Sequence, residues 1–476
     1  MLFSSLEFLL GFLPVAVGGT ALLVALGERR FFVAYLLAAS FVFYAWRIPE
    51  HFVLLAFSIG FNYAAGRYLY RTRSRFALAT AVAVNLALLA AFKYAGFVAD
   101  NLNGLAGVEV SFGAIVLPLA ISFYTFQQIA YLVDSRRGDA APHRFLDYAL
   151  FVAFFPQLIA GPIVHHKELT PQFSGPRFAT FRADDIRAGI VLFSIGLAKK
   201  VLIADNLRPV ADASFGAAAL GVEPSMAEAW IGTLAYAFQI YFDFSAYSDM
   251  ALGLGRAFGV TLPVNFDSPY KAASIIEFWR RWHITLSRFL RDYLYVPLGG
   301  NRRGPQRRYA NLMIVMLLGG LWHGANWTFV VWGGLHGLYL VVNHLWSRMA
   351  GGRIALPRPV GGLITFVAVL VAWVFFRAGS FGEAFTMLHA MSGAGAAAHG
   401  GLALFRDVGF ALVFVPIAAG IAWCCPNALE ILRRIEEAPE ARRSGAFATA
   451  GLGAATALAL VSLYASGPYE FIYFQF

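Results

Sequence analysis

Apolar stretches long enough to cross a membrane recur from one end of this 476-residue chain to the other. A helix needs about 20 consecutive apolar residues to span the hydrocarbon core of a bilayer. Such stretches leave no room for a soluble domain of any size, so we expect a single membrane-embedded domain over residues 1–476. The predicted fold is an all-α polytopic membrane protein with about 11–13 transmembrane helices. The candidate spans lie near 4–26, 31–48, 51–69, 76–98, 112–134, 187–204, 226–248, 309–327, 328–347, 360–377, 407–424 and 446–466.

Charge supports this class and predicts an orientation. Charged residues make up 13% of the chain, where an ordinary soluble domain has about 25%. The net charge of +10 would raise the question of nucleic acid in a soluble protein, but here Lys and Arg gather in short loops such as 27–30 and 71–75. That pattern follows the positive-inside rule. We therefore expect no nucleic-acid partner, basic loops in the cytoplasm and both chain ends on the periplasmic side.

Residues 145–164 depart from the spanning pattern. The segment is apolar, but Pro156 and Pro162 interrupt it and basic residues lie on both sides. Both flanks are therefore expected in the cytoplasm, which predicts a re-entrant element. Irregular backbone of this kind is tolerated at membrane depth where protein or a water-filled cavity covers it.

Polar residues also lie within and beside the predicted spans. Gln127 and Gln128 stand inside the span near 112–134, where we expect them to line a cavity or to cross-link helices. His165 follows the re-entrant element, and we expect it to lie in solvent.

Residues 262–308 contain no spanning stretch, yet they are far from a polar linker. At ~100° per residue, a helical wheel separates an apolar arc from a basic arc. The apolar arc holds Trp279, Trp282, His283, Leu286, Phe289, Leu290 and Tyr293, and the basic arc holds Arg280, Arg281, Arg288 and Arg291. We predict one amphipathic helix in the cytoplasmic interface, followed by a basic turn before the chain enters the membrane again.

Two histidines lie among tryptophans and glycines in "GGLWHGANWTFVVWGGLHG", residues 319–337. On a helix that starts at the cytoplasmic surface, His323 lies ~21 Å deep, past the middle of a hydrocarbon core about 30 Å thick. His336 would lie about 20 Å further along one continuous helix, roughly on its opposite face. The two can share a site only if the chain turns back between them, which the "ANW" segment permits.

Each of these histidines has two interpretations. An ionisable group at such depth indicates function, but an imidazole can also be satisfied by a carbonyl or hydroxyl between packed helices. His283 lies at the border of the apolar and basic arcs. It could face a cavity that opens to the cytoplasm, or it could anchor the interfacial helix beside its two tryptophans. The spacing of His323 and His336 matches no metal motif.

Two carboxylates interrupt the span near 226–248 and its continuation. Asp243 and Asp249 stand in "YFDFSAYSDMALGLGRAFG" together with Ser245 and Tyr247. Carboxylates near a span are costly unless they are paired or hydrated. They could serve catalysis, but they could equally pair with Arg256 or with the basic interfacial helix. We favour the structural role.

Several long motifs occur in one order along the chain. They are "FPQLIAGPIVHHKEL", "YFDFSAYSDMALGLGRAFG", "NFDSPYKA", "FWRRWHITLSRFLRDYLYVPLGGNRRG", "LLGGLWHGANWTFVVWGGLHG" and the terminal "FIYFQF". Together they closely resemble the membrane-bound O-acyltransferase (MBOAT) superfamily, in the bacterial branch of the alginate O-acetylation and teichoic acid D-alanyl transfer proteins. The resemblance covers nearly the whole chain.

The resemblance implies a fold and a reaction. The fold would be a ring of tilted helices around a funnel or tunnel, with re-entrant and interfacial helices lining it. The reaction would be acyl transfer from a thioester to a hydroxyl. His323 falls on the family's invariant histidine and would be the general base, a task suited to a group that titrates near neutrality. His283 falls on the second polar position and would orient the thioester or stabilise charge near its carbonyl.

Further positions follow from the resemblance and from the basic pattern. The supporting or tunnel-lining residues would be His336, Asp243, Ser245, Tyr247, Asp249, Trp282, Trp322 and Asn326. The phosphates of the donor would meet Arg280, Arg281, Arg302 and Arg303 through charge-assisted bonds.

The resemblance also implies the substrates. We expect no bound cofactor and no metal, and a donor that is acetyl-CoA or another acyl thioester, such as an acyl carrier. A periplasmic or membrane-attached partner would pass the acetyl group to an extracellular polysaccharide. The aromatic tail "PYEFIYFQF" would contribute to the surface that meets this partner, and the enzyme would lie in the bacterial inner membrane. An acceptor that is a lipid or a protein is an alternative, and so is a transporter, which would show inverted repeats or paired broken helices.

Overall fold

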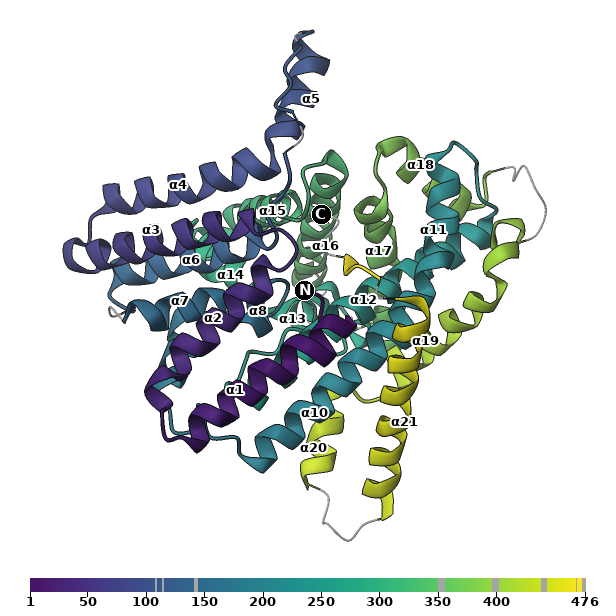
Figure 1. Ribbon diagram of the computed structural model, residues 1–476. Helices are drawn as coiled ribbons and strands as arrows, with labels where there is room; N and C mark the ends of the chain where they lie inside the picture. Colours follow the sequence, from purple (N-terminus) through teal and green to yellow (C-terminus); the bar gives the residue numbers. More distant parts are fainter. Residues whose placement is uncertain are drawn as a thin grey trace. The chain divides into compact units, whose positions relative to one another are not determined.

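In the computed structural model, all regular secondary structure among the described residues is helical, with no strand among them (Figure 1). These are residues 1–107, 109–113, 115–140, 144–349, 356–395, 402–437, 443–467 and 469–472. They form two compact units that interleave along the chain. The first unit comprises Met1–Leu197, Tyr247–Val264 and the described residues from Glu436 onward, and the second comprises Ala198–Ala246 and Asn265–Ile435. The prediction of a single domain is not decided by this division.

The first unit contains most of the N-terminal helices. They are α1 (Leu13–Ala25), α2 (Phe32–Ala45), α3 (Glu50–Thr72), α4 (Arg75–Lys93), α5 (Ala95–Ala106), α6 (Ile121–Arg137), α7 (Phe145–Ala153), α8 (Phe155–Leu158), α9 (His166–Leu169), α10 (Ala183–Ala198) and α21 (Arg443–Ser466). Helices α3, α4 and α6 lie side by side, and α5 extends away from them (Figure 1).

Amide side chains link these neighbouring helices. The side chains of Asn62 in α3 and Asn85 in α4 exchange hydrogen bonds of 3.0 and 2.8 Å. Gln128 of α6 donates to the hydroxyl of Ser58 in α3 at 2.8 Å, and Gln127 donates to a backbone carbonyl of α7 at 3.1 Å. Of the two roles predicted for the glutamines, these contacts support the cross-linking of helices.

Several predicted boundaries in this unit shift. The span expected near 112–134 is helical only from Ile121, and the span near 76–98 divides at Tyr94 into α4 and α5. The apolar element at 145–164 is broken as expected: α7 ends at Ala153, and Pro156 lies in the first turn of α8, where its missing N–H is not needed. Its re-entry from the cytoplasm stays a prediction.

His165 is not in solvent, so that prediction is wrong. Its side chain is buried at the N-terminus of α9, where it accepts a hydrogen bond from the backbone N–H of Glu168. Only part of the aromatic tail is described: Phe471 is buried in the first unit, whereas Pro468 and residues 473–476 lie outside the described residues. The role predicted for the tail therefore stays a prediction.

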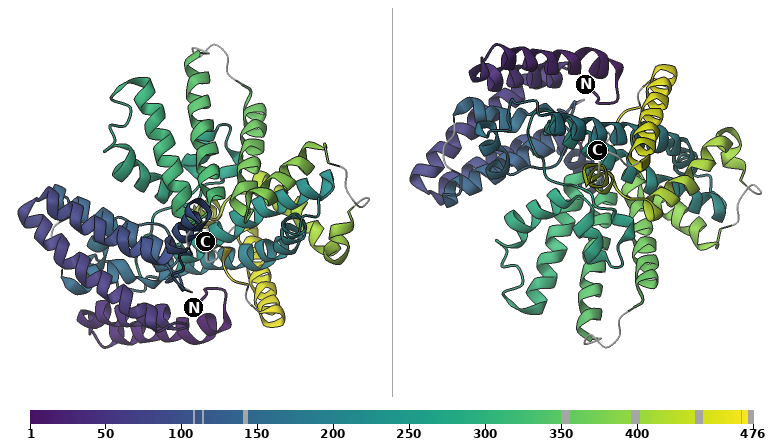
Figure 2. Two further views of the ribbon diagram at one scale, coloured as in Figure 1. Left: turned by 90° about the horizontal axis from the view of Figure 1, so that it is seen from above. Right: turned by 90° about the horizontal axis from the view of Figure 1, so that it is seen from below.

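The second unit carries the central motifs. Its helices are the π-helix η4 (Lys199–Ala204), α11 (Asp205–Ala219), the first part of α12 (Met226–Ala257), α13 (Ile275–Arg281), α14 (Ile284–Leu290), the π-helix η6 (Arg291–Tyr295), α15 (Gly304–His323), α16 (Trp327–Met349), α17 (Arg358–Arg377), α18 (Phe381–Ser392), α19 (Phe414–Cys424) and α20 (Ala428–Glu437). Figure 2 shows α15 and α16 from above and below, in green.

Helices α15 and α16 form a tight antiparallel hairpin. Helix α15 ends at His323, because Gly324 is extended with φ −157°, and α16 begins at Trp327. Glycines allow the two backbones to meet: a Cβ at Gly320 would lie 3.2 Å from the Cα of Gly333 and would collide with the carbonyl of Phe329. The turn that the "ANW" segment permits is therefore present.

The predicted interfacial helix is not one helix, so that part of the prediction is wrong. Helix α13 ends at Arg281, Trp282 is extended, and α14 begins at Ile284. His283 lies between them with φ 44°, in the left-handed region that a non-glycine residue rarely adopts. The helical wheel assumed continuous rotation across this break. Trp282 and His283 are almost completely buried, and the position of this segment in the cytoplasmic interface stays a prediction.

Among the described residues, five helical segments are long and apolar enough to cross a membrane by length and composition. They are Glu7–Ala25, Glu50–Thr72, Arg75–Lys93, Arg358–Arg377 and Ala403–Cys424. All five overlap predicted spans. The other predicted spans coincide with helices that are shorter or more polar, and their crossing of the membrane stays a prediction.

Candidate active site

His283 and His323 meet in the second unit, although 40 residues separate them in the sequence. The centres of their imidazole rings are 6.4 Å apart. His323 is the last residue of α15, and His283 occupies the break between α13 and α14. Both are buried, with exposed fractions of 4% and 0%. Two imidazoles at this separation can contact one small substrate group.

Asn265 holds His283 in one orientation. Its Oδ1 atom lies 3.1 Å from His283 Nδ1 and accepts hydrogen bonds from the backbone N–H and the hydroxyl of Thr285, at 3.2 and 2.8 Å. A backbone N–H can only donate, so the oxygen of the Asn265 amide must face this cluster. His283 Nδ1 therefore carries the proton, and in the neutral ring Nε2 has the lone pair and acts as the acceptor.

Burial keeps His283 neutral. It lies outside every candidate span, and burial lowers its pKa from the ordinary 6.5 to about 3. Besides its side-chain contact, Asn265 accepts a hydrogen bond through its backbone carbonyl from the N–H of Ile284 at 3.0 Å. The two contacts together hold the left-handed backbone of His283. Strained residues persist where the surroundings over-determine them, and they concentrate at functional sites.

His336 joins the same aromatic cluster through the α15–α16 turn. Its ring centre is 4.8 Å from that of Trp332, which in turn lies 5.0 Å from that of His323. The indole N–H of Trp279 donates to Nδ1 of His336 at 3.3 Å. Indole is only a donor, so the proton of neutral His336 lies on Nε2. His323 and His336 therefore do not lie on opposite faces of one continuous helix, because the turn brings both into one aromatic cluster.

The other supporting residues take different places. The Trp322 ring lies 4.9 Å from that of His323. The Trp282 ring stacks on that of Phe278 at 5.7 Å, and Phe278 stacks on His336 at 6.0 Å, so both tryptophans belong to the cluster. Asn326 has a structural role at the hairpin turn. It accepts from the N–H of Thr328 at 3.1 Å and donates to the carbonyl of Gly379 at 2.8 Å.

The carboxylate of Asp243 has an ion-pair partner that the sequence did not indicate. Lys200 Nζ lies 2.7 Å from carboxylate oxygens of both Asp243 and Asp205, and all three side chains are buried. Arg256, one of the two partners considered for the carboxylates, instead pairs with Asp185 in the first unit, at 3.3 Å. The pairing supports the structural role we favoured for Asp243, with a different cation.

Ser245, Tyr247 and Asp249 follow on the same helix. Ser245 is buried in the second unit, and Phe244 beside it packs edge-on against His283 at 4.8 Å between ring centres. Tyr247 and Asp249 belong to the first unit, where the Tyr247 ring stacks on that of Phe3 at 4.6 Å. Within that unit, Tyr247 is a packing residue.

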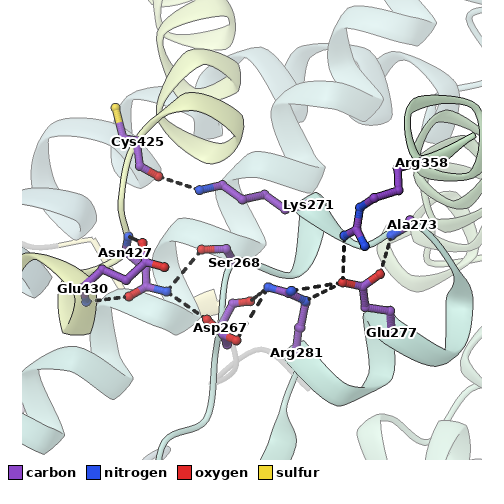
Figure 3. A network of polar contacts seen from close by, with 10 residues as sticks. All are labelled: Asp267, Ser268, Lys271, Ala273, Glu277, Arg281, Arg358, Cys425, Asn427 and Glu430. Carbon is purple, nitrogen blue, oxygen red and sulfur yellow. Dashed lines mark hydrogen bonds and ion pairs between the residues drawn. The ribbon is translucent and has the colours of Figure 1, made fainter.

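The arginines proposed to contact donor phosphates divide into two groups. Arg281 is engaged in the network of Figure 3, where its guanidinium lies 3.0 Å from Glu277 and 3.6 Å from Asp267. Arg280, Arg302 and Arg303 are exposed. The exposed three are therefore better placed to meet an anion than Arg281, whose partner Glu277 also accepts from the backbone N–H of Ala273 just before α13.

Sequence reasoning missed three residues of this site. Asn265 stands in the quoted "NFDSPYKA" motif, but no spacing rule connects it with His283. Trp332 and Lys200 lie on elements whose contacts depend on the α15–α16 turn and on the packing of η4. The helical wheel placed Trp279 on the same arc as His283, although the chain breaks between the two residues.

Comparisons with known proteins agree with the family resemblance that the sequence motifs indicate. The model of the membrane-bound O-acyltransferase family matches residues 135–378, which include His283, His323 and His336. The chain is 44% identical over 424 residues to the peptidoglycan O-acetyltransferase of Helicobacter pylori, covering 83% of this chain and 80% of that protein.

Two further relatives extend the comparison. The chain is 45% identical over 404 residues to a probable alginate O-acetylase of Pseudomonas aeruginosa, covering 82% of this chain and 75% of the relative. It is 26% identical over 280 residues to a teichoic acid D-alanyltransferase of Streptococcus thermophilus, covering 54% and 68%. The chain therefore belongs to the membrane-bound O-acyltransferase family, as an integral membrane O-acyltransferase.

Proposed function

We propose that this enzyme transfers an acetyl group from a cytoplasmic thioester to an acceptor that leads to O-acetylation of an extracellular polysaccharide. The single observation that carries the proposal is the pairing of His283 and His323, with ring centres 6.4 Å apart inside a buried aromatic cluster. The names of two relatives at 44% and 45% identity, acting on peptidoglycan and alginate, support the polysaccharide.

His323 is the general base in this proposal. The acceptor hydroxyl attacks the thioester carbonyl carbon while His323 takes its proton, and the C–S bond then breaks. The leaving thiolate takes that proton from the imidazolium, so the histidine returns to its neutral form. A positioned base of this kind contributes roughly 10²–10⁴-fold to the rate.

His283 orients the reacting groups without being protonated itself. Its Nδ1–H is directed to Asn265, so Nε2 can only accept a hydrogen bond from the substrate. Stabilising negative charge on the carbonyl oxygen would require a hydrogen-bond donor at Nε2. Because Nε2 is an acceptor in this tautomer, the role in orientation is favoured over the role in charge stabilisation. The attacking hydroxyl has one proton and gives it to His323, so the donor that His283 would hold is another N–H or O–H group of the bound substrates.

The donor is proposed to be acetyl-CoA or an acetylated carrier that approaches from the cytoplasm. Arg280, Arg302 and Arg303 are exposed and can form charge-assisted hydrogen bonds with its phosphates. A periplasmic or membrane-attached partner would complete the transfer to polysaccharide. The enzyme would lie in the inner membrane, with both chain ends on the periplasmic side.

The test measures radiolabelled acetyl transfer from acetyl-CoA by the full-length enzyme in lipid nanodiscs. We expect His323→Ala to reduce transfer by at least about 100-fold while size exclusion and the melting temperature stay close to wild type. Wild-type rates in a folded His323→Ala enzyme would remove His323 from the role of base. If the label appears on lipid or on protein and not on polysaccharide, the proposed acceptor is wrong, but the proposed role of His323 as base is unaffected.

A further inference from the structure

The second unit contains a cavity of about 550 Å³ that has no histidine in its lining. Its base is aromatic: the ring of Phe366 lies 5.2 Å from that of Tyr270 and 5.0 Å from that of Trp423. Ligand pockets are roughly 300–1,000 Å³ and combine apolar walls with a few placed polar groups. The complete lining is Tyr270, Lys271, Ala273, Arg358, Pro359, Gly362, Leu363, Phe366 and Trp423.

Both charged residues of this lining are cations. Lys271 donates to the backbone carbonyl of Cys425 at 2.7 Å. This acceptor is uncharged, so the contact does not neutralise the positive charge of the lysine. Arg358 lies 3.4 Å from Glu277, but its side chain is 75% exposed and Glu277 is shared with Arg281 (Figure 3). Exposed pairs of this kind contribute little, so Arg358 can turn towards an anion at small cost.

The position of the cavity indicates what occupies it. Arg358, Gly362 and Phe366 belong to the first turns of the candidate span Arg358–Arg377, and Trp423 belongs to the last turn of the candidate span Ala403–Cys424. The cavity therefore lies where two spans end. Tryptophan and basic residues are enriched at that level because lipid headgroups lie there.

We propose that this cavity binds the headgroup of an anionic phospholipid, with its phosphate between Lys271 and Arg358 and an acyl chain along Leu363 and Phe366. The two cations match the negative charge of the lipid, and the apolar wall continues along α17, where the Leu363 side chain is 65% exposed. Basic pockets at the ends of spans bind anionic headgroups in this way. The proposal does not depend on the catalytic roles given above.

The test is native mass spectrometry of the full-length enzyme in neutral detergent, titrated with phosphatidylglycerol or with phosphatidylcholine of the same acyl chains. The variant Lys271→Gln/Arg358→Gln removes both charges and keeps a donor towards Cys425 and Glu277. We expect wild type to bind phosphatidylglycerol about tenfold to thirtyfold more tightly than the variant. Affinity for phosphatidylcholine should change much less.

Two matched controls make the result specific. Arg348→Gln/Arg433→Gln removes two exposed arginines that do not line the cavity, and it should bind phosphatidylglycerol within about twofold of wild type. Lys271→Arg/Arg358→Lys keeps both charges and should restore most of the affinity. Equal loss in the Arg348/Arg433 control, or no loss in the Lys271/Arg358 variant, would overturn the proposal.

A third measurement distinguishes the lipid from the phosphates of the donor. Free coenzyme A is added to the enzyme with bound phosphatidylglycerol. We expect no displacement of the lipid, and equal coenzyme A affinity in wild type and in Lys271→Gln/Arg358→Gln. If coenzyme A displaces the lipid, or if its own affinity falls in the variant, the cavity belongs to the donor and the lipid proposal is wrong.

Discussion

The amide oxygen of Asn265 lies 3.1 Å from Nδ1 of His283 and so determines which nitrogen of that imidazole faces the reaction. Replacing Asn265 with Ala removes this acceptor and releases the Thr285 backbone as well. We expect acetyl transfer to fall by about 10- to 100-fold, and the free energy of unfolding to fall by about 1–3 kcal/mol from the unsatisfied donors.

Asn265→Asp tests the same contact by charge. A carboxylate keeps the acceptor oxygen that faces His283 and Thr285 but favours the protonated imidazole, because opposite charges stabilise each other. Nuclear magnetic resonance of labelled histidine should then show that His283 has a higher pKa than in the wild-type enzyme. An unchanged His283 signal in Asn265→Asp would contradict the assignment of the tautomer.

The buried neutral His283 predicts a particular pH dependence of stability. The folded pKa of about 3 lies below the unfolded value of 6.5, so the unfolded state binds more protons between these values. The contribution of neutral His283 to the free energy of unfolding is therefore fully present above pH 6.5, and it is lost as the pH decreases towards 3. At pH 5 the contribution lost is about 2 kcal/mol. His283→Asn should lose less stability than wild type between pH 7 and pH 5 in thermal melts, and parallel curves would contradict this account.

His336 is predicted to act by positioning Trp279 and Trp332. Asn places an amide oxygen near the position of Nδ1, whereas Gln places its amide near Nε2. We therefore expect His336→Asn to keep the contact with Trp279 and most of kcat, and His336→Gln to lose more than about tenfold through misplaced groups. KM should change little in both. If Gln preserves kcat and Asn does not, Nε2 contacts the substrate directly.

The α15–α16 hairpin predicts two opposite outcomes for neighbouring glycines. Gly333→Ala would drive a methyl group into the backbone of α15, and we expect a loss of at least about 1–3 kcal/mol in the free energy of unfolding. At Gly334 the nearest atom to an added Cβ is Leu317 Cδ2 at 3.5 Å, which is ordinary contact. Gly334→Ala should therefore be neutral or slightly stabilising, because alanine favours helix. Equal losses at both positions in denaturant titrations would contradict the packing described.

Patterns in the sequence were sufficient where they reflect local chemistry. Apolar stretches predicted the membrane class, and Pro156 predicted the break after α7. The order of the motifs indicated the O-acyltransferase family, which decides against the transporter alternative. The "ANW" segment permitted the turn that brings His323 near His336.

The rest depended on long-range packing that no periodicity expresses. A helical wheel cannot show that the chain breaks at Trp282 and His283, because the break is held by Asn265, 18 residues earlier. The partner of Asp243 could not be chosen from composition either. Several cations were available, and the π-helix η4 places Lys200 within 2.7 Å.

The central claim is that His283 and His323 act together in one transfer step, and a double-mutant cycle tests it most directly. Acetyl transfer rates are measured for wild type, His283→Asn, His323→Ala and the double variant, all in nanodiscs and all with matched melting temperatures. We predict that the double variant is no more than about threefold slower than His323→Ala alone, because residues that act as a unit are strongly non-additive. Losses that multiply in the double variant would show two independent contributions and contradict the claim.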